Sequence, residues 1–105
     1  MAINNVRLTT TDPTVVFQAV GQQAVTVMYI CNTTANDVNV NVFCIDSSDS
    51  TGAGETNMIY SQLSITGNDT YVIDLEKIIL NNGDSIEVEP SVANSITVTT
   101  STIAI

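Results

Sequence analysis

Residues 22–45 read QQAVTVMYICNTTANDVNVNVFCI, and this stretch decides the fold class. Apolar residues recur at every second position in two runs, 25–31 and 38–44, on either side of the polar residues 32–37. A period of two is typical of β-strands with one buried face. The stretch therefore predicts a β-hairpin with residues 32–37 as its loop.

The apolar rows set the register expected of this hairpin. Val25 faces Cys44 and Cys31 faces Val38, and a slip by one residue would place asparagines opposite apolar side chains. The residues predicted to face the core are Val25, Val27, Tyr29 and Cys31 with Val38, Val40, Val42 and Cys44. Because the two cysteines lie far apart along this ladder, we expect free, buried thiols, with a disulfide as the less favoured alternative.

The composition extends the β prediction to the whole chain. Among 105 residues there are 15 Thr, 13 Val and 12 Ile but only 4 Leu, and β-branched residues favour strands over helices. Further strands are expected at about 3–9, 14–20, 58–66, 70–75, 77–80, 85–89 and 96–104. The sequence predicts one all-β domain over 1–105, with 1–9 as a candidate N-terminal arm. Its expected architecture is an antiparallel β-sandwich of about seven to nine short strands, jelly-roll-like or Ig-like, with Greek-key connections. A single helical turn at 74–80 is the local alternative.

Several function classes are excluded by what the chain lacks. One Arg (Arg7) and one Lys (Lys77) within a formal net charge of −9 cannot neutralise a phosphate backbone, so we expect no nucleic-acid partner. With no His, the usual general base and imidazole metal ligand are missing. The start of the chain lacks the pattern of an export signal, and no stretch of about 18 apolar residues could span a membrane. The sequence therefore predicts neither an enzyme nor a membrane protein.

Two groups of carboxylates need separate consideration. Residues 46–55 hold three acids beside two glycines, which suits Ca²⁺ in principle, but the spacing of an EF-hand is absent and a solvated loop is favoured. The pairs Asp74 with Glu76 and Glu87 with Glu89 each share a strand face, as glycosidase carboxylates would have to. Since aromatic residues are few, a solvated strand face is the favoured interpretation here too. We thus expect no catalytic residue, no cofactor and no metal ion.

Turn-and-strand segments of residues 25–105 support a resemblance to a known class of protein. These segments are Ile30–Ala35 (ICNTTA), Met58–Tyr60 (MIY), Leu63–Ile65 (LSI), Gly67–Tyr71 (GNDTY), Val72–Leu75 (VIDL), Leu80–Val88 (LNNGDSIEV) and Ala93–Val98 (ANSITV). The chain resembles the small β-sandwich virion proteins of tailed bacteriophages, particularly those of cyanobacterial and marine phages. The resemblance implies a non-catalytic virion part and transfers no functional residue.

The leading hypothesis is a capsid cement or decoration protein that stabilises the phage head by bridging capsomers. Its expected partners are copies of itself, in a homotrimer, and the major capsid protein; its location would be the virion, and the host cytoplasm during assembly. A neck, tail, baseplate or fibre component is the alternative, and a carbohydrate- or Ca²⁺-binding β-sandwich module is the alternative of another class. A cluster of exposed tyrosines beside residues 46–57 would favour the binding module.

The expected contact residues come from apolar positions outside the predicted core row. Met28, Phe43 and Ile45 lie on the opposite face of the hairpin, which is too apolar to meet only water and is expected to be covered by another subunit or a second layer. The N-terminal and C-terminal strands add further apolar positions. The predicted interface residues are Ile3, Leu8, Met28, Phe43, Ile45, Ile103 and Ile105.

Overall fold

The computed structural model describes residues 2–74 and 78–105, and within them every regular element is a β-strand. The strands are Ala2–Leu8 (β1), Thr14–Gln18 (β2), Gln23–Asn32 (β3), Val38–Ile45 (β4), Met58–Ile65 (β5), Thr70–Ile73 (β6), Ile78–Leu80 (β7), Ser85–Pro90 (β8) and Ile96–Ala104 (β9). The predicted all-β class and the positions of the strands are confirmed. Of the segment considered as a helical turn, 74–80, residues 78–80 form strand β7, and residues 75–77 lie outside the described residues.

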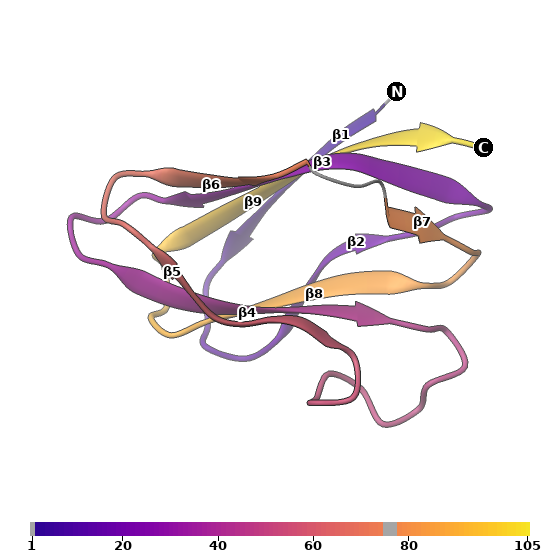
Figure 1. Ribbon diagram of the computed structural model, residues 1–105, viewed down its shortest axis with the longest axis horizontal. Coiled ribbons are helices and arrows are strands. Elements are labelled where there is room, and N and C mark those ends of the chain that lie inside the picture. The colour runs from indigo at the N-terminus through magenta and orange to yellow at the C-terminus, as the bar shows by residue number, and fades with distance from the viewer. Residues whose placement is uncertain (1, 75–77) are drawn as a thin grey trace.

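The strands form two antiparallel sheets that face each other, as Figure 1 shows. Sheet A has the order β1-β9-β3-β6, with β7 also paired to β3, and sheet B has the order β2-β8-β4-β5. The strand pairs are nested like the two arms of one long hairpin. In this arrangement β1 pairs with β9, β2 with β8, β3 with β6 and β7, and β4 with β5. Such a hairpin, rolled so that successive arms alternate between two sheets, is a jelly roll with Greek-key connections.

The hairpin predicted for residues 22–45 is wrong. Strand β3 belongs to sheet A and β4 to sheet B, so residues 33–37 cross between the sheets instead of closing a hairpin. Strand β4 pairs with β5 and β8, placing Val40 opposite Leu63 and Val42 opposite Val88. The alternation of apolar residues predicted the positions of the two strands correctly, but it does not determine which strands pair with each other.

The core face of β3 also differs from the prediction. A bulge between Val25 and Val27 inserts Thr26, whose hydroxyl donates to the Ser101 carbonyl at 3.0 Å. Beyond this extra residue the alternation is reversed. Met28 and Ile30 are therefore buried in the core, whereas Tyr29 is 42% exposed on the outer face.

The hydrophobic core fills the space between the sheets. In β4 the predicted row of Val38, Val40 and Val42 does face this core. The other fully buried members come from both sheets and include Leu8, Val16, Met28, Ile30, Ile65, Ile86, Val88, Ile96 and Val98. Burial of aliphatic side chains from all parts of the chain stabilises one domain.

One end of the outer face of sheet B is covered by the chain itself. Phe43 and Ile45 stand opposite Glu87 and Ser85 on this outer face, yet they are only 2% and 7% exposed and lie outside the core cluster. The segment 46–57 hangs on the same side of sheet B in Figure 1, and it returns to β4 through the bond from the Cys44 N–H to the Asn57 carbonyl. No second subunit is needed to bury these two side chains.

Candidate functional site

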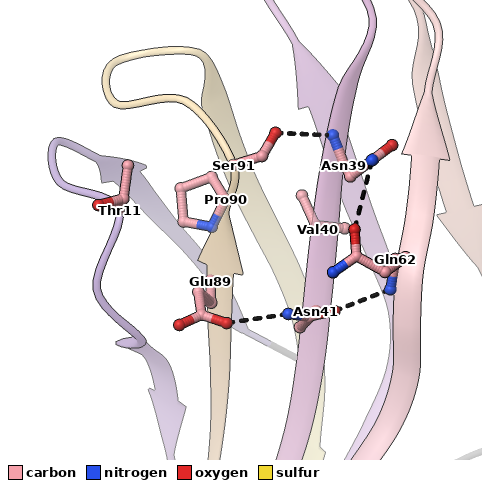
Figure 2. Close-up of a pocket in the computed structure, with 8 residues that line it drawn as sticks. All are labelled: Thr11, Asn39, Val40, Asn41, Gln62, Glu89, Pro90 and Ser91. Atoms are coloured by element: carbon pink, nitrogen blue, oxygen red, sulfur yellow. Dashed lines mark hydrogen bonds between the residues drawn. The ribbon is translucent and has the colours of Figure 1, made fainter.

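The described part of the structure has a polar cleft on the outer face of sheet B, where β8, β4 and β5 lie side by side (Figure 2). Its volume is about 280 Å³. The cleft is lined by Thr11, Asn39, Val40, Asn41, Gln62, Glu89, Pro90 and Ser91. Asn39 and Asn41 reach it because they are the outward-facing residues of β4, in alternation with the buried valines.

A bulge in β5 shapes one wall of the cleft. Val40 pairs with Leu63 and Val42 pairs with Tyr60, so two residues of β5 oppose the single residue Asn41. One of the two, Gln62, has a φ of 55°, a left-handed conformation that is unfavourable for a residue with a side chain. The Oδ1 of Asn41 accepts a hydrogen bond from the Gln62 N–H at 2.8 Å and so holds the bulge in place.

The cleft residues are tied together across three strands. Asn41 Nδ2 donates to Glu89 Oε1 at 2.9 Å, and Asn39 Nδ2 donates to Gln62 Oε1 at 3.4 Å (Figure 2). Ser91 is fixed to Asn39 by two bonds, one from each backbone N–H. These contacts preorganise amide, hydroxyl and carboxylate groups that can bind a hydroxyl-rich molecule. Among the described residues that line the cleft, Glu89 is the one carboxylate, whereas glycoside hydrolysis uses a pair.

The acidic loop 46–57 uses its carboxylates to fold itself. Asp46 Oδ1 accepts bonds from the N–H and the hydroxyl of Ser48, both at 2.9 Å. Asp49 accepts from the hydroxyl and N–H of Thr51 and from Asn57, and these hydrogen bonds hold the pKa of Asp49 below its ordinary value. Within residues 2–74 and 78–105, no three side chains of Asp, Glu, Cys or His lie close enough together to hold a metal ion. The site considered for Ca²⁺ therefore has the geometry of a self-capped loop.

The two cysteines lie in different sheets. Both are free, as predicted, but they are half-buried rather than fully buried. Cys31 stands between Thr97 and Thr70 in sheet A, and Cys44 pairs with Ile86 in sheet B. Burial, followed by the negative charge of Asp84, raises the pKa of Cys44. A raised pKa keeps the thiol protonated and makes it a poor nucleophile.

The structure separates the predicted contact residues into two groups. Leu8, Met28, Phe43 and Ile45 are at most 7% exposed, so their side chains stabilise this chain and cannot meet a partner at its surface. This corrects their interpretation as contact residues. Ile3 and Ile105 are 71% and 63% exposed, and Ile103 is half-buried; these three remain at the surface of sheet A.

The tyrosines do not form a platform beside the acidic loop. Tyr60 of β5 and Tyr71 of β6 meet edge to face, with ring centroids 6.3 Å apart. Since β5 is an edge of sheet B and β6 an edge of sheet A, this pair bridges the two sheets on one side of the sandwich. Tyr29 lies instead on the outer face of sheet A, in register with Val72. The arrangement expected of an aromatic carbohydrate site is absent from these three residues.

The described strands of sheet A hold no carboxylate, a feature that the sequence pattern alone did not reveal. None of the Asp or Glu residues lies in β1, β3, β6, β7 or β9. Arg7 is the one charged residue of these strands, and its guanidinium donates to Thr33 Oγ1, Thr97 Oγ1 and the Asn94 carbonyl. The exposed apolar residues of these strands are Ile3, Tyr29, Tyr71, Val72 and Ile79. The signal was present in the sequence, but it emerges only when the strands are grouped by sheet.

Comparison of the chain with protein-family models, with curated proteins and with solved structures finds no match. Among the described residues, no helix is long and apolar enough to cross a membrane. Two surfaces therefore bear on function, the polar cleft and the outer face of the carboxylate-free strands of sheet A.

Proposed function

We propose that the protein is a non-catalytic structural protein of a tailed-bacteriophage virion, and specifically a capsid cement or decoration protein that bridges capsomers. Its partners would be further copies of itself and the major capsid protein. The observation that supports this proposal best is that the described strands of sheet A hold no carboxylate and a single charged residue, Arg7, on a chain with a formal net charge of −9. The jelly-roll topology and the resemblance in sequence support the same class of function.

The face has the chemistry of a protein contact. Protein interfaces are depleted in charged residues at their centre and enriched in apolar and aromatic ones. Four strands across and up to ten residues along, the face measures at most about 19 Å by 33 Å, or about 630 Å², which is somewhat less than the roughly 800 Å² per partner of a standard interface. The described acidic residues lie in loops and on β8, where they keep the protein soluble and away from nucleic acid.

The location of the protein in the particle distinguishes a cement protein of the head from a neck, tail, baseplate or fibre component. A cement protein of the head would be present in copy numbers on the order of hundreds, because it follows the icosahedral shell. A neck, tail, baseplate or fibre component would form one ring or a few copies. Cryo-electron microscopy of the intact particle, with the protein assigned to density, tests this directly. Absence of the protein from purified particles would contradict the structural proposal as a whole.

Binding to empty shells tests the role of the sheet A face. Shells lacking the protein should recover resistance to heat when the wild-type chain is added. A variant with Tyr29→Glu and Val72→Glu places two charges on the outer face, and it should lose both shell binding and the protection. The matched control Val15→Glu with Ile59→Glu adds the same charges on exposed residues of sheet B strands and should bind normally.

The polar cleft supports a second candidate function, a carbohydrate-binding module. Its amide groups and the Glu89 carboxylate can pair with sugar hydroxyls, which both donate and accept hydrogen bonds. Titration with a panel of glycans should then show binding that is lost in Gln62→Ala and retained in Gln22→Ala, a matched exposed glutamine outside the cleft. Failure of every glycan to bind at millimolar concentration would remove this candidate.

A further inference from the structure

The two sheets have four edges in all, and these edges differ in how well they are protected from pairing with another chain. The edges are β1 and the pair β6 and β7 in sheet A, and β2 and β5 in sheet B. An edge strand presents unpaired backbone N–H and C=O groups, which can add a strand from another molecule. Natural proteins block such edges with bulges, prolines, charges or very short strands.

Three of the edges carry such blocks. Strand β5 has two irregularities in its pairing with β4, and its residue Gln62 is in the left-handed conformation. Strand β2 is five residues long, follows Pro13 and has a bulge between Val15 and Phe17. Strands β6 and β7 contain four and three residues. Within residues 2–74 and 78–105, none of these three edges offers a long regular backbone to a second chain.

Strand β1 is different. It pairs with β9 over seven residues without interruption, from Ala2 opposite Thr102 to Leu8 opposite Ile96. It contains no proline, glycine or carboxylate, and the side chains of residues 2–5 are exposed. The Asn4 side chain links β1 to β2, because its Nδ2 donates to the Val16 carbonyl at 2.6 Å; this bond uses no backbone group of β1 and leaves the β1 edge open. In Figure 1, β1 runs past the body of the sandwich toward the N-terminus.

We propose that β1 pairs in antiparallel fashion with β1 of a second copy of this chain, across a two-fold axis. This inference deepens the self-assembly part of the proposed function, on which it rests. A second copy can occupy this edge because β1 holds no carboxylate, so two chains that each carry −9 meet along the strand where their mutual repulsion is smallest. The same strand on both sides gives the self-complementary contact that two-fold symmetry requires.

The register of this contact follows from the strand itself. Centring the pair on Asn5 overlaps all seven residues and keeps the core-facing sides of both copies on the same side of the joined sheet. It places Ile3 opposite Arg7 of the second copy, so the two guanidinium groups stay apart and the exposed Ile3 gains a neighbour. The two copies of sheet A then form one continuous sheet. A two-fold contact yields a dimer, which departs from the homotrimer expected from the sequence.

Measurement of the mass in solution tests the proposal. Sedimentation equilibrium of the full chain should give twice the monomer mass of 11.2 kDa at high concentration. Ile3→Lys adds a charge opposite Arg7 and should weaken association by about tenfold or more. Ile59→Lys is the matched control, because Ile59 is an exposed isoleucine on the edge strand β5, and its dimer should be unchanged. Circular dichroism checks that both variants are folded.

Hydrogen exchange identifies the strand that forms the contact. In the dimer, the β1 amides that point away from β9 should be protected, and the same amides should exchange rapidly in Ile3→Lys. A wild-type chain that stays monomeric, a trimer, a dimer with unprotected β1 amides, or an equal loss in Ile59→Lys would each overturn the proposal. None of these results decides whether the protein binds capsid shells, so failure here is distinguishable from failure of the proposed function.

Discussion

The side-chain amide of Asn32 donates to the backbone carbonyl of Ile65 at 3.0 Å, and this bond ties the end of β3 in sheet A to the end of β5 in sheet B. Asn32 is fully buried. Its Nδ2 also donates to the Asn36 carbonyl at 2.7 Å, and its Oδ1 accepts from the N–H and hydroxyl of Thr34. One side chain therefore shapes the crossing between the sheets and satisfies the backbone groups that the crossing leaves without partners.

Replacement of Asn32 by alanine should destabilise the fold by about 3 kcal/mol, because several buried polar groups lose their partner at once. Urea unfolding of Asn32→Ala measures the change. Asn36→Ala is the control, since the side chain of Asn36 is exposed and it is the Asn36 carbonyl that takes part in the crossing. Its effect should stay within about 0.5 kcal/mol. An Asn32→Ala variant as stable as the control would contradict this role.

Gly67 is the second residue on which the crossings depend. A Cβ at this position would overlap the backbone carbonyl of Ala35, and the two turns are already joined by the bond from the Asn68 N–H to the Thr34 carbonyl at 2.7 Å. Since backbone must move to admit the methyl group, Gly67→Ala should cost on the order of 3 kcal/mol. Gly54→Ala is the matched control, because nothing lies within 4 Å of its Cβ position. Thermal unfolding of both variants separates steric overlap from a general effect of replacing glycine.

These two residues also show what could be read from the sequence. Runs of Val, Ile and Thr between turn residues place the strands to within a few residues, because β-branched side chains and turn chemistry act locally. The partner of each strand is not a local property. Residues 32–37 look like a hairpin loop, and only the buried bonds of Asn32 show that they cross between sheets.

The face of β3 and the cleft could not be predicted for a similar reason. Both faces of β3 are apolar, so the pattern could not reveal the bulge at Thr26 that reverses the core face. The cleft brings together Asn41, Gln62 and Glu89 from three strands, and no spacing in the sequence connects them. A left-handed glutamine has no sequence signature either, because it is held by the side chain of Asn41.

Replacement of Thr100 should stabilise the fold, in contrast to the replacements of Asn32 and Gly67. This residue is fully buried on β9, and its hydroxyl has no hydrogen-bond partner. Thr100→Val replaces the unpaired hydroxyl with a methyl group of similar size and should stabilise the fold by about 1 kcal/mol. Thr26→Val is the matched control, since the Thr26 hydroxyl does donate to Ser101 and its loss should destabilise the fold. Equal effects of the two substitutions in urea unfolding would show that the hydroxyl of Thr100 is satisfied in solution.

The stability should fall in acid through Asp84. Its carboxylate accepts bonds from the N–H groups of Ser47 and Asn81, both at 2.9 Å, and these bonds hold its pKa below the ordinary value. A lowered folded-state pKa means that the stabilisation is present above about pH 4 and is lost as the pH falls through the folded-state value. In Asp84→Asn the stability should depend less on pH between about 2 and 5. An NMR titration that places the Asp84 pKa at or above the ordinary value would contradict this account.

The same carboxylate affects the thiol of Cys44. Burial is the larger cause of the raised pKa of Cys44, and the negative charge of Asp84 adds to it. At pH 8 the native protein should therefore alkylate at Cys44 more slowly than an unstructured peptide thiol, because only the thiolate reacts. Asp84→Asn removes the smaller cause and should raise the rate modestly, whereas unfolding in urea should remove both causes and restore the peptide rate. Mass spectrometry of alkylated peptides gives the rate at each cysteine. If Asp84→Asn increased the rate at Cys44 as much as unfolding does, the charge and not burial would be the main control of this thiol.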